Sequence, residues 1–181
     1  MANTEKAHEE WRGLYLGDAV YGANDGIITT FAVVSGAAGA GISSGVIVIL
    51  GIANLIADGI SMGLSNYLSL RSKAEYQKKL GITENAIEKP SRHGLATSIS
   101  FVFCGALPLI PYIFGVSSSF QFPISIVATA ISLFLVGSLR NIVTSTGWLR
   151  SGIEMLLVGG LAASAAYGIG LALKTLFGIV V

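Results

Sequence analysis

Five long apolar stretches, each bounded by polar or glycine-rich segments, divide this chain. A helix needs about 20 apolar residues to cross the hydrocarbon layer, whereas the strands of a membrane barrel alternate over about ten. We therefore expect an all-α integral membrane protein, with one domain of five transmembrane helices over residues 1–181. The expected spans are about 14–38, 46–70, 94–114, 122–144 and 149–176.

The segments between these stretches contain the residues that usually end or bend helices. Glycines and serines predict a hairpin turn over 35–45. Pro108 and Pro111 predict a kink in the third span, and Pro123 stands where a proline that opens a helix belongs. Segment 71–93 is the only long polar segment, and we expect it to be a loop outside the bilayer.

The positive charges predict how the chain is oriented in the membrane. Ten of the eleven Lys and Arg residues precede the first span, follow the second or flank the turn after the fourth, and only Lys174 lies at the other side. Because Lys and Arg concentrate in cytoplasmic loops, we expect the N-terminus and the 71–93 loop to be cytosolic and the C-terminus to lie across the membrane.

Composition narrows the class of protein further. Charged residues make up 12% of the chain and apolar residues 52%, whereas about 25% of an average soluble domain is charged. A net charge of +1 gives no reason to expect nucleic-acid binding. Cys104 is the only cysteine, and both His8 and His93 lie in segments expected to be outside the membrane, which argues against a histidine-built zinc site.

Polar residues interrupt the first span. Asp18 and Asp25 are seven residues apart, almost two helical turns, so both carboxylates point the same way, and Asn24 lies beside the second. A carboxylate near the bilayer centre costs about 2.5–3.5 kcal/mol on insertion scales. We therefore expect these acids to have a function.

The second span carries a matching polar ridge of four residues. Asn54, Asp58, Met62 and Asn66 recur every fourth position and therefore lie on one side of a helix. If this ridge faces the first span, it adds a carboxylate, a thioether and two amides to the acids there. Oxygen ligands suit divalent cations, and a thioether among them favours softer transition metals over Mg²⁺ or Ca²⁺.

Glycines accompany both polar segments. Gly22 and Gly26 form a GxxxG pattern around Asp25, and Gly59 and Gly63 form another around Met62. Since this pattern lets membrane helices approach closely, we expect a tight helix contact built around the polar atoms.

Simpler structural roles remain open for several of these residues. Asp18 could be solvated at the cytosolic boundary beside Arg12, and Asp58 could pair with Arg140. Met62 could simply pack. The amides of Asn54 and Asn66 could serve as interhelical hydrogen-bonding groups.

Charged residues near the cytosolic ends have two interpretations as well. Glu154 follows Arg150 by four residues, which favours an ion pair, and Met155 beside it suits packing. The acids of the 71–93 loop could collect cations near the mouth of a path; they are Glu75, Glu84 and Glu88.

Two segments resemble the vacuolar iron transporter family: GDAVYGANDGIITTFAVVSGAAGA, which contains Asp25, and ANLIADGISMGLSNYLSLRSKAEY, which contains Met62. The resemblance implies a homodimeric carrier with its ion path between the first helices of two copies. It implies transport of Fe²⁺, often also Mn²⁺, out of the cytosol in exchange for protons. It also implies that Asp25 and Met62 are membrane metal ligands and that Asp18 lies near the cytosolic mouth.

The chain departs from the plant and fungal members at two places. Segment 71–93 is too short and too basic for their glutamate-rich metal-binding domain. The glutamate that they tend to carry eight residues before the methionine is Asn54 here, and Asp58 follows one turn later.

The function that we expect is a secondary carrier that exports Fe²⁺ and/or Mn²⁺ in exchange for protons. Metal and protons would compete because carboxylates clustered in a low-dielectric site repel each other unless a cation or a proton is bound. The alternatives are a non-transporting membrane assembly or scaffold protein and a carrier of another divalent cation. The expected metal residues are Asp18, Asp25, Asp58 and Met62, with Asn24, Asn54 and Asn66 as further polar lining.

An enzyme is not expected, since the sequence has no phosphate loop and no nucleophile–base pair within a span. No cofactor is expected, because the metal ion is the substrate. The expected partners are the metal ion, protons, the lipid bilayer and a second copy of the chain. The absence of extensions favours the plasma membrane of a prokaryote, and in a eukaryote we expect a vacuole-like organelle.

Overall fold

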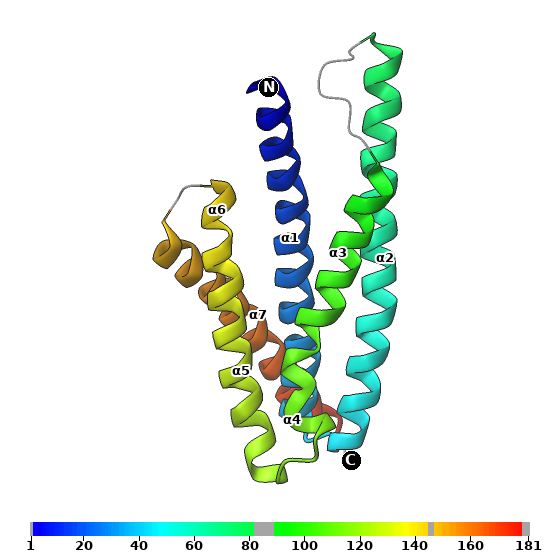
Figure 1. The fold of residues 1–181 in the computed structure, drawn as a ribbon. Coiled ribbons are helices and arrows are strands. Elements are labelled where there is room, and N and C mark those ends of the chain that lie inside the picture. Colours follow the sequence, from blue (N-terminus) through cyan, green and yellow to red (C-terminus); the bar gives the residue numbers. More distant parts are fainter. Residues whose placement is uncertain (1, 82–88, 145–146, 179–181) are drawn as a thin grey trace.

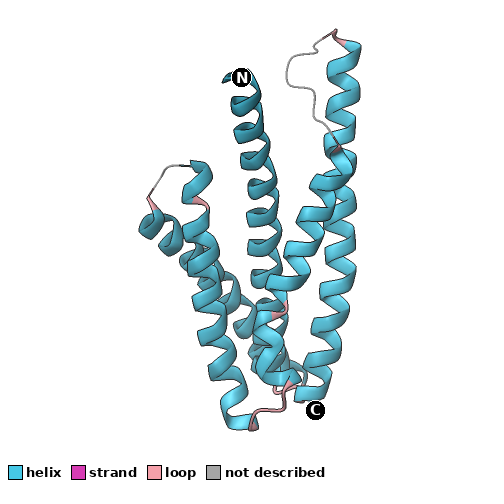
Figure 2. Cartoon of the chain, in the orientation of Figure 1, coloured by secondary structure: helices cyan, strands magenta, loops and turns pink. Residues whose placement is uncertain are grey.

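The computed structural model describes residues 2–81, 89–144 and 147–178, and it describes side chains from Tyr15 onwards, those of 143 and 144 excepted. Every element in these ranges is helical, as Figure 2 shows. The elements are α1 (Ala2–Ala40), α2 (Ser44–Lys79), α3 (Pro90–Gly105), the 3₁₀ turn η1 (Leu107–Leu109), α4 (Ile110–Ile113), α5 (Ser118–Leu139), α6 (Asn141–Thr144) and α7 (Trp148–Phe177).

Helix α1 is the centre of the bundle. It packs mainly against α3 and α7, and it also contacts α5 and α2 (Figure 1). Both hydrophobic core clusters include side chains from α1: Phe31 and Val34 pack with Phe101 of α3, and Ile27 packs with Leu133 of α5. The polar residues of α1 are therefore held where several helices meet.

Four of the described helical segments are long and apolar enough to cross a membrane, which confirms an integral membrane protein of the all-α class. They are α2, the α3–η1–α4 segment, α5 and α7. Helix α1 has the length but does not reach the same apolarity over the described residues. The fifth span thus remains a prediction.

The first predicted turn is shorter than we expected. Helix α1 runs on to Ala40, and only residues 41–43 separate it from α2, so the prediction of a turn over 35–45 is wrong. Tertiary packing explains the extension, because a side chain at Gly39 would collide with the backbone of Tyr167 in α7. Gly41, with φ +77°, makes the actual turn.

The predicted 71–93 loop is also largely helical. Helix α2 continues to Lys79, and α3 already begins at Pro90, which is favoured in the first helical turn. The Arg71 Nε to Glu75 Oε1 ion pair of 2.9 Å supports the added turns of α2, since residues four apart are neighbours on a helix. Glu84 and Glu88 lie outside the described residues.

The prolines of the third span break it as predicted. Helix α3 ends at Gly105, and Pro108 and Pro111 lie in the short η1 and α4 elements that follow. Pro123, in contrast, does not open its helix, because α5 begins five residues earlier at Ser118. The α5 prediction therefore placed the helix start too late, and the fourth span ends at Leu139 rather than 144.

The glycine pairs do make close helix contacts, but α3 is their partner. A Cβ at Gly22 or Gly26 would collide with α3 backbone carbonyls, and one at Gly63 would come within 2.8 Å of the Gly94 carbonyl of α3. A Cβ at Gly59 would come within 2.7 Å of Val102 in α3. The two glycine patterns therefore press α1 and α2 against α3 and not against each other.

Candidate functional site

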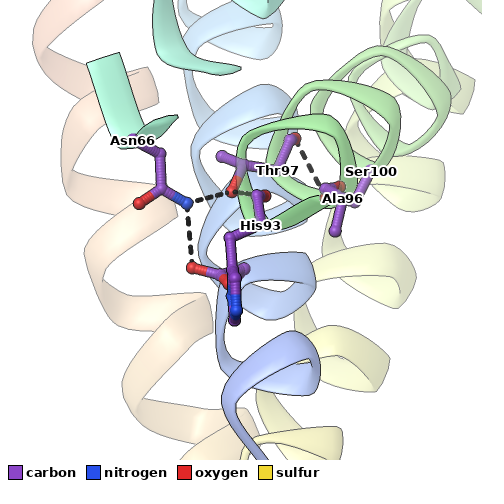
Figure 3. Close-up of polar contacts among 6 residues, drawn as sticks. Asn66, His93, Ala96, Thr97 and Ser100 are labelled. Atoms are coloured by element: carbon purple, nitrogen blue, oxygen red, sulfur yellow. Dashed lines mark hydrogen bonds and ion pairs between the residues drawn. The ribbon is translucent and has the colours of Figure 1, made fainter. Parts of the chain in front are cut away.

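The Asp18 cluster consists of Asp18, Asn66, His93 and Thr97, from α1, α2 and α3. Asn66 Nδ2 donates to Asp18 Oδ1 at 2.9 Å and to Thr97 Oγ1 at 2.7 Å. His93 Nδ1 contacts the second carboxylate oxygen, Oδ2. Thr97 Oγ1 in turn donates to the His93 carbonyl at 3.0 Å. Figure 3 shows Asn66 of α2 pointing towards Thr97 and His93 of α3.

His93 is where the sequence analysis was wrong. It was placed in a polar loop outside the membrane, yet it belongs to α3 and is only 2% exposed. The Tyr15 ring stacks on it, with ring centroids 4.2 Å apart. Proline in the first helical turn was the available signal, because a helix that starts at Pro90 carries residue 93 into the bundle.

This cluster also decides between the interpretations of Asp18. The side chain is 18% exposed and paired, rather than solvated at a boundary. The Arg12 side chain, its suggested neighbour, lies outside the described side chains. Both oxygens of Asp18 contact side chains of this same chain, so a metal ion that reached Asp18 would have to compete with them.

Asp25 lies seven residues further along α1 in a different environment. It is half-buried, and the nearby charge that acts on it is that of Asp58 in α2. Among the described residues, no side chain donates a hydrogen bond to either carboxylate, and the hydroxyl of Thr29 bonds only to the Asp25 backbone carbonyl, at 2.8 Å. Two neighbouring carboxylates without a donor attract a cation.

Two amides next to these acids are also left without partners. Asn24 Oδ1 and Asn54 Nδ2 are both buried, and neither has a hydrogen-bond partner among the described residues. Buried polar atoms are nearly always paired, so these two amide atoms have capacity for a further hydrogen bond or ligand. The two ends of an amide are assigned rather than observed, and Asn54 can therefore also present its oxygen.

The polar ridge of α2 lies beside the buried face of that helix, and its four residues are all half-buried. The first residue of the ridge, Asn54, has a buried amide nitrogen, and the last, Asn66, hydrogen-bonds to Asp18 of α1. Met62 is half-buried and packs on the core cluster that contains Leu55 and Phe101. The thioether is thus on the protein side of α2. Within the described residues, no group of three or more His, Cys, Asp or Glu side chains gathers closely enough to hold a metal ion.

The sequence analysis missed a polar stripe on α5. Gln121, Ser125, Thr129 and Ser132 are all buried, at 8% exposure or less. Ser125 Oγ donates to the Pro108 carbonyl at 2.7 Å, and Ser44 Oγ donates to the Gln121 amide oxygen at 2.5 Å. The spacing of about four residues was visible in the sequence, but the residues carry no charge and so were not singled out.

The charged residues near the start of α7 form an ion pair as expected. Arg150 Nε bonds to Glu154 Oε1 at 3.0 Å, and Arg140 Nη1 lies 3.7 Å from Glu154 Oε2. Met155 is buried in the core cluster with Leu133. Arg140 thus has Glu154 as an ion-pair partner.

Comparison with known proteins places this geometry in a family. The model of the VIT family matches residues 16–81 and 75–171, which include both polar segments. A vacuolar iron transporter of Centaurea cyanus is 26% identical over 224 aligned positions, which cover 93% of this chain and 91% of that protein. Vacuolar iron transporter 1 of Oryza sativa subsp. japonica is 25% identical, with 87% and 85% covered.

A third relative comes from a distant organism. The vacuolar iron transporter of Toxoplasma gondii is 25% identical, with 91% of this chain and 76% of that protein covered. The alignment with the Centaurea protein is longer than the 181 residues of this chain, so the relative carries residues that this chain lacks. The family match spans the Asp18 cluster, the facing carboxylates and the α5 stripe, and the chain belongs to the VIT family.

Proposed function

We propose that this protein is a secondary carrier that moves Fe²⁺, and/or Mn²⁺, out of the cytosol in exchange for protons. The arrangement that carries the proposal is the pair of acids Asp25 and Asp58: Asp58 of α2 lies near enough for its charge to act on Asp25, and no described side chain donates a hydrogen bond to either carboxylate. The names of the relatives, all vacuolar iron transporters, support the choice of metal.

The proposed site combines hard and soft ligand atoms. Asp25 and Asp58 supply negative charge, Asn24 and Asn54 supply neutral oxygen, and Met62 supplies a thioether. Carboxylate, carbonyl and thioether groups together suit a borderline divalent ion better than Mg²⁺, which prefers oxygen alone. This is a transient site for a substrate that must also leave, so few charged ligands are an advantage.

Protons can replace the metal at the same atoms. When no cation lies between them, two carboxylates in a low-dielectric site are stabilised by taking up a proton. Protons that arrive from the far side would therefore release the ion, and the loss of protons towards the cytosol would prepare the site for the next one.

In this proposal a second copy completes the path. Two copies would bring two Asp25 side chains and two Met62 side chains to one path between their first helices. The cytosolic side is the end with Arg71 and Arg140, as the distribution of Lys and Arg predicts. The site belongs to a plasma membrane in a prokaryote or to a vacuole-like membrane in a eukaryote.

A flux assay tests the proposal. Proteoliposomes are loaded with a dye that Fe²⁺ quenches, a pH gradient is imposed, and the rate of quenching is compared for wild type, Asp25→Asn and the matched control Glu154→Gln, which removes a charge at the bundle end. We expect wild type and Glu154→Gln to transport at similar rates and Asp25→Asn to lose transport.

Other results would overturn it. Equal Fe²⁺ flux in wild type and Asp25→Asn would remove Asp25 from the path. No flux of any divalent ion, together with a dimer that loosens in Asp25→Asn, would favour an assembly protein. Flux of Mg²⁺ or Ca²⁺ but not of Fe²⁺ or Mn²⁺ would indicate a carrier of another cation.

A further inference from the structure

A groove of about 400 Å³ runs along the contact between α2 and α3 on the outside of the bundle. Ile60 and Leu64 of α2 and Leu95 of α3 line its apolar part, and each of these side chains is more than half exposed. The two helices pack side by side (Figure 1), and both belong to segments that can cross a membrane. The groove therefore opens towards lipid.

The two ends of the groove differ in polarity. Helices α2 and α3 run in opposite directions, and their register is fixed by a close contact, since a Cβ at Gly94 of α3 would lie 3.0 Å from the Cβ of Tyr67 in α2. Tyr67 and the exposed Ser91 line the end nearer the polar segment 71–93. Ile60 lies seven residues before Tyr67, about 10 Å further along α2 into the expected membrane layer. Hydroxyl groups thus mark one end and apolar side chains the other.

Arg71 is held beside the polar end of the groove. It lies one helical turn beyond Tyr67, and its Nη1 donates to the Tyr67 hydroxyl at 3.3 Å, while its Nε donates to Glu75 Oε1 at 2.9 Å. A guanidinium has five N–H donors, so these two contacts leave three for another partner. The side chain is 57% exposed. Since guanidinium groups bind phosphate oxygens with two parallel N–H donors, Arg71 suits a phosphate at the mouth of the groove.

Further positive charge gathers at the same end. Segment 71–93 carries six Lys and Arg residues and three acids. Of the acids, Glu75 already pairs with Arg71, and the other two lie outside the described residues. Arg92 is exposed and lies one helical turn from Leu95 in the groove wall. Because Lys and Arg clusters next to a membrane helix attract anionic headgroups, the charge at this end selects for an anionic lipid.

We propose that this groove binds one anionic phospholipid from the leaflet at the Arg71 end of the bundle. Its phosphate binds the remaining N–H groups of Arg71, and its ester region lies beside the hydroxyls of Tyr67 and Ser91. An acyl chain then follows the apolar wall at Leu64 and Leu95. Charge, hydroxyls and apolar side chains succeed one another along the two helices in the order in which a phospholipid presents phosphate, esters and acyl chains.

This site is separate from the proposed metal path. Ile60 and Leu64 each lie two residues from Met62, and two residues turn an α-helix by about 200°. The groove and the polar ridge therefore lie on nearly opposite sides of α2. A lipid in the groove does not contact the acids, so its binding can be measured without metal and does not depend on whether the protein transports Fe²⁺.

Two matched pairs of residues test the charge and the shape of the groove. Arg71 and Arg150 each bond through Nε to a glutamate four residues later, at 2.9 and 3.0 Å, but Arg150 belongs to α7. Leu95 and Leu157 are 60% and 62% exposed, and only Leu95 lines the groove. Arg71→Gln and Arg150→Gln thus each remove one charge from an exposed ion pair. Leu95→Trp narrows the groove, and Leu157→Trp adds the same bulk to α7.

Native mass spectrometry of the delipidated full-length protein, with no metal present, measures lipid binding and oligomeric state together. The probes are phosphatidylglycerol, phosphatidylcholine and inorganic phosphate. We expect wild type to bind one phosphatidylglycerol per copy more tightly than phosphatidylcholine. Arg71→Gln should weaken this binding about fivefold, as the loss of one Arg near an anionic headgroup predicts, and Arg150→Gln should not change it. Leu95→Trp should abolish the tight binding, and Leu157→Trp should retain it.

Several results would overturn the proposal. Equal effects of Arg71→Gln and Arg150→Gln would show only the general attraction of a basic surface, and equal binding by Leu95→Trp and Leu157→Trp would exclude the groove. Inorganic phosphate that binds as tightly as phosphatidylglycerol would make this a phosphate site without a lipid. A change of oligomeric state in Leu95→Trp alone would make the groove an interface between copies. If Leu95→Trp lowers the melting temperature of the delipidated protein, the exposed arginine pair decides the question.

Discussion

Two aspartates on one helix face are treated in opposite ways by their surroundings. Asp18 contacts Asn66 and His93 with its two carboxylate oxygens. Asp25, seven residues away, lies near the like charge of Asp58 and receives no hydrogen bond from a described side chain. A buried charge is costly unless it is paired. The Asp18 cluster therefore joins three helices, whereas the unpaired acids Asp25 and Asp58 favour the binding of a cation.

A cationic side chain placed near Asp25 should remove the difference in pairing between the two aspartates. We expect this change to have the largest effect on Fe²⁺ flux. Asp58→Lys would give Asp25 the kind of partner that Asp18 already has, and Fe²⁺ flux should fall by at least about 100-fold, because even outer partners of metal ligands often change affinity 10–100-fold. The melting temperature of the same sample should stay level or rise. Asp58→Asn is the milder control, and unchanged flux in Asp58→Lys would contradict the prediction.

Removing the partner of Asp18 should have the reverse signature. His93→Leu leaves a mostly buried carboxylate short of a contact, which should lower the free energy of unfolding by about 2–3 kcal/mol. Chemical denaturation in detergent measures it. In the double variant with Asp18→Leu, part of the loss should return, because neither polar group is then left alone. A single variant as stable as wild type would show that the pair does not hold the helices.

The thioether of Met62 tests which ion the proposed site at Asp25 prefers. Met62→Leu keeps the volume and the packing on Phe101 but removes the sulfur. We expect the preference for Fe²⁺ over Mg²⁺, measured by competition in the flux assay, to fall several-fold, since sulfur favours softer ions. Stability should change by less than about 1.5 kcal/mol. An unaltered preference would assign Met62 to packing alone.

The exposed ion pair of α7 should have the smallest effect on stability. Arg150→Ala removes a partner of Glu154 in a contact that water reaches, since these side chains are 77% and 44% exposed. Such pairs contribute about 1 kcal/mol or less. Denaturation midpoints should therefore shift only slightly, and flux should not change. A loss as large as that of His93→Leu would mean that exposure is a poor guide to the value of these pairs.

Much of the fold followed from local patterns in the sequence. The apolar runs located the long helices, and the spacing of Asn54, Asp58, Met62 and Asn66 puts them on one ridge of α2, where all four are half-buried. The ends of helices were less predictable. The segment before Gly41 reads as a turn by composition, but contacts with α7 keep it helical, and such contacts join residues more than 100 positions apart.

The candidate site was predictable in its charged members and not in its pairing. Asp18 and Asp25 look alike in the sequence, because both are isolated acids in an apolar run. What separates them is His93, which was taken for a loop residue, and the glycines that place α3 between α1 and α2. The spacing of the acids predicts neither the pairing of Asp18 nor the position of α3.

The position of α1 in the chain bears on how the protein is made. This helix is not among the four described segments that are long and apolar enough to cross a membrane, and the helices that bury it leave the ribosome later. The final packed position of α1 thus depends on α3 and on α7, which is synthesised last. During biosynthesis the helix with the acids is therefore made before the helices that pack on it. A chain truncated before α7 would lack one of the two helices that pack most against α1.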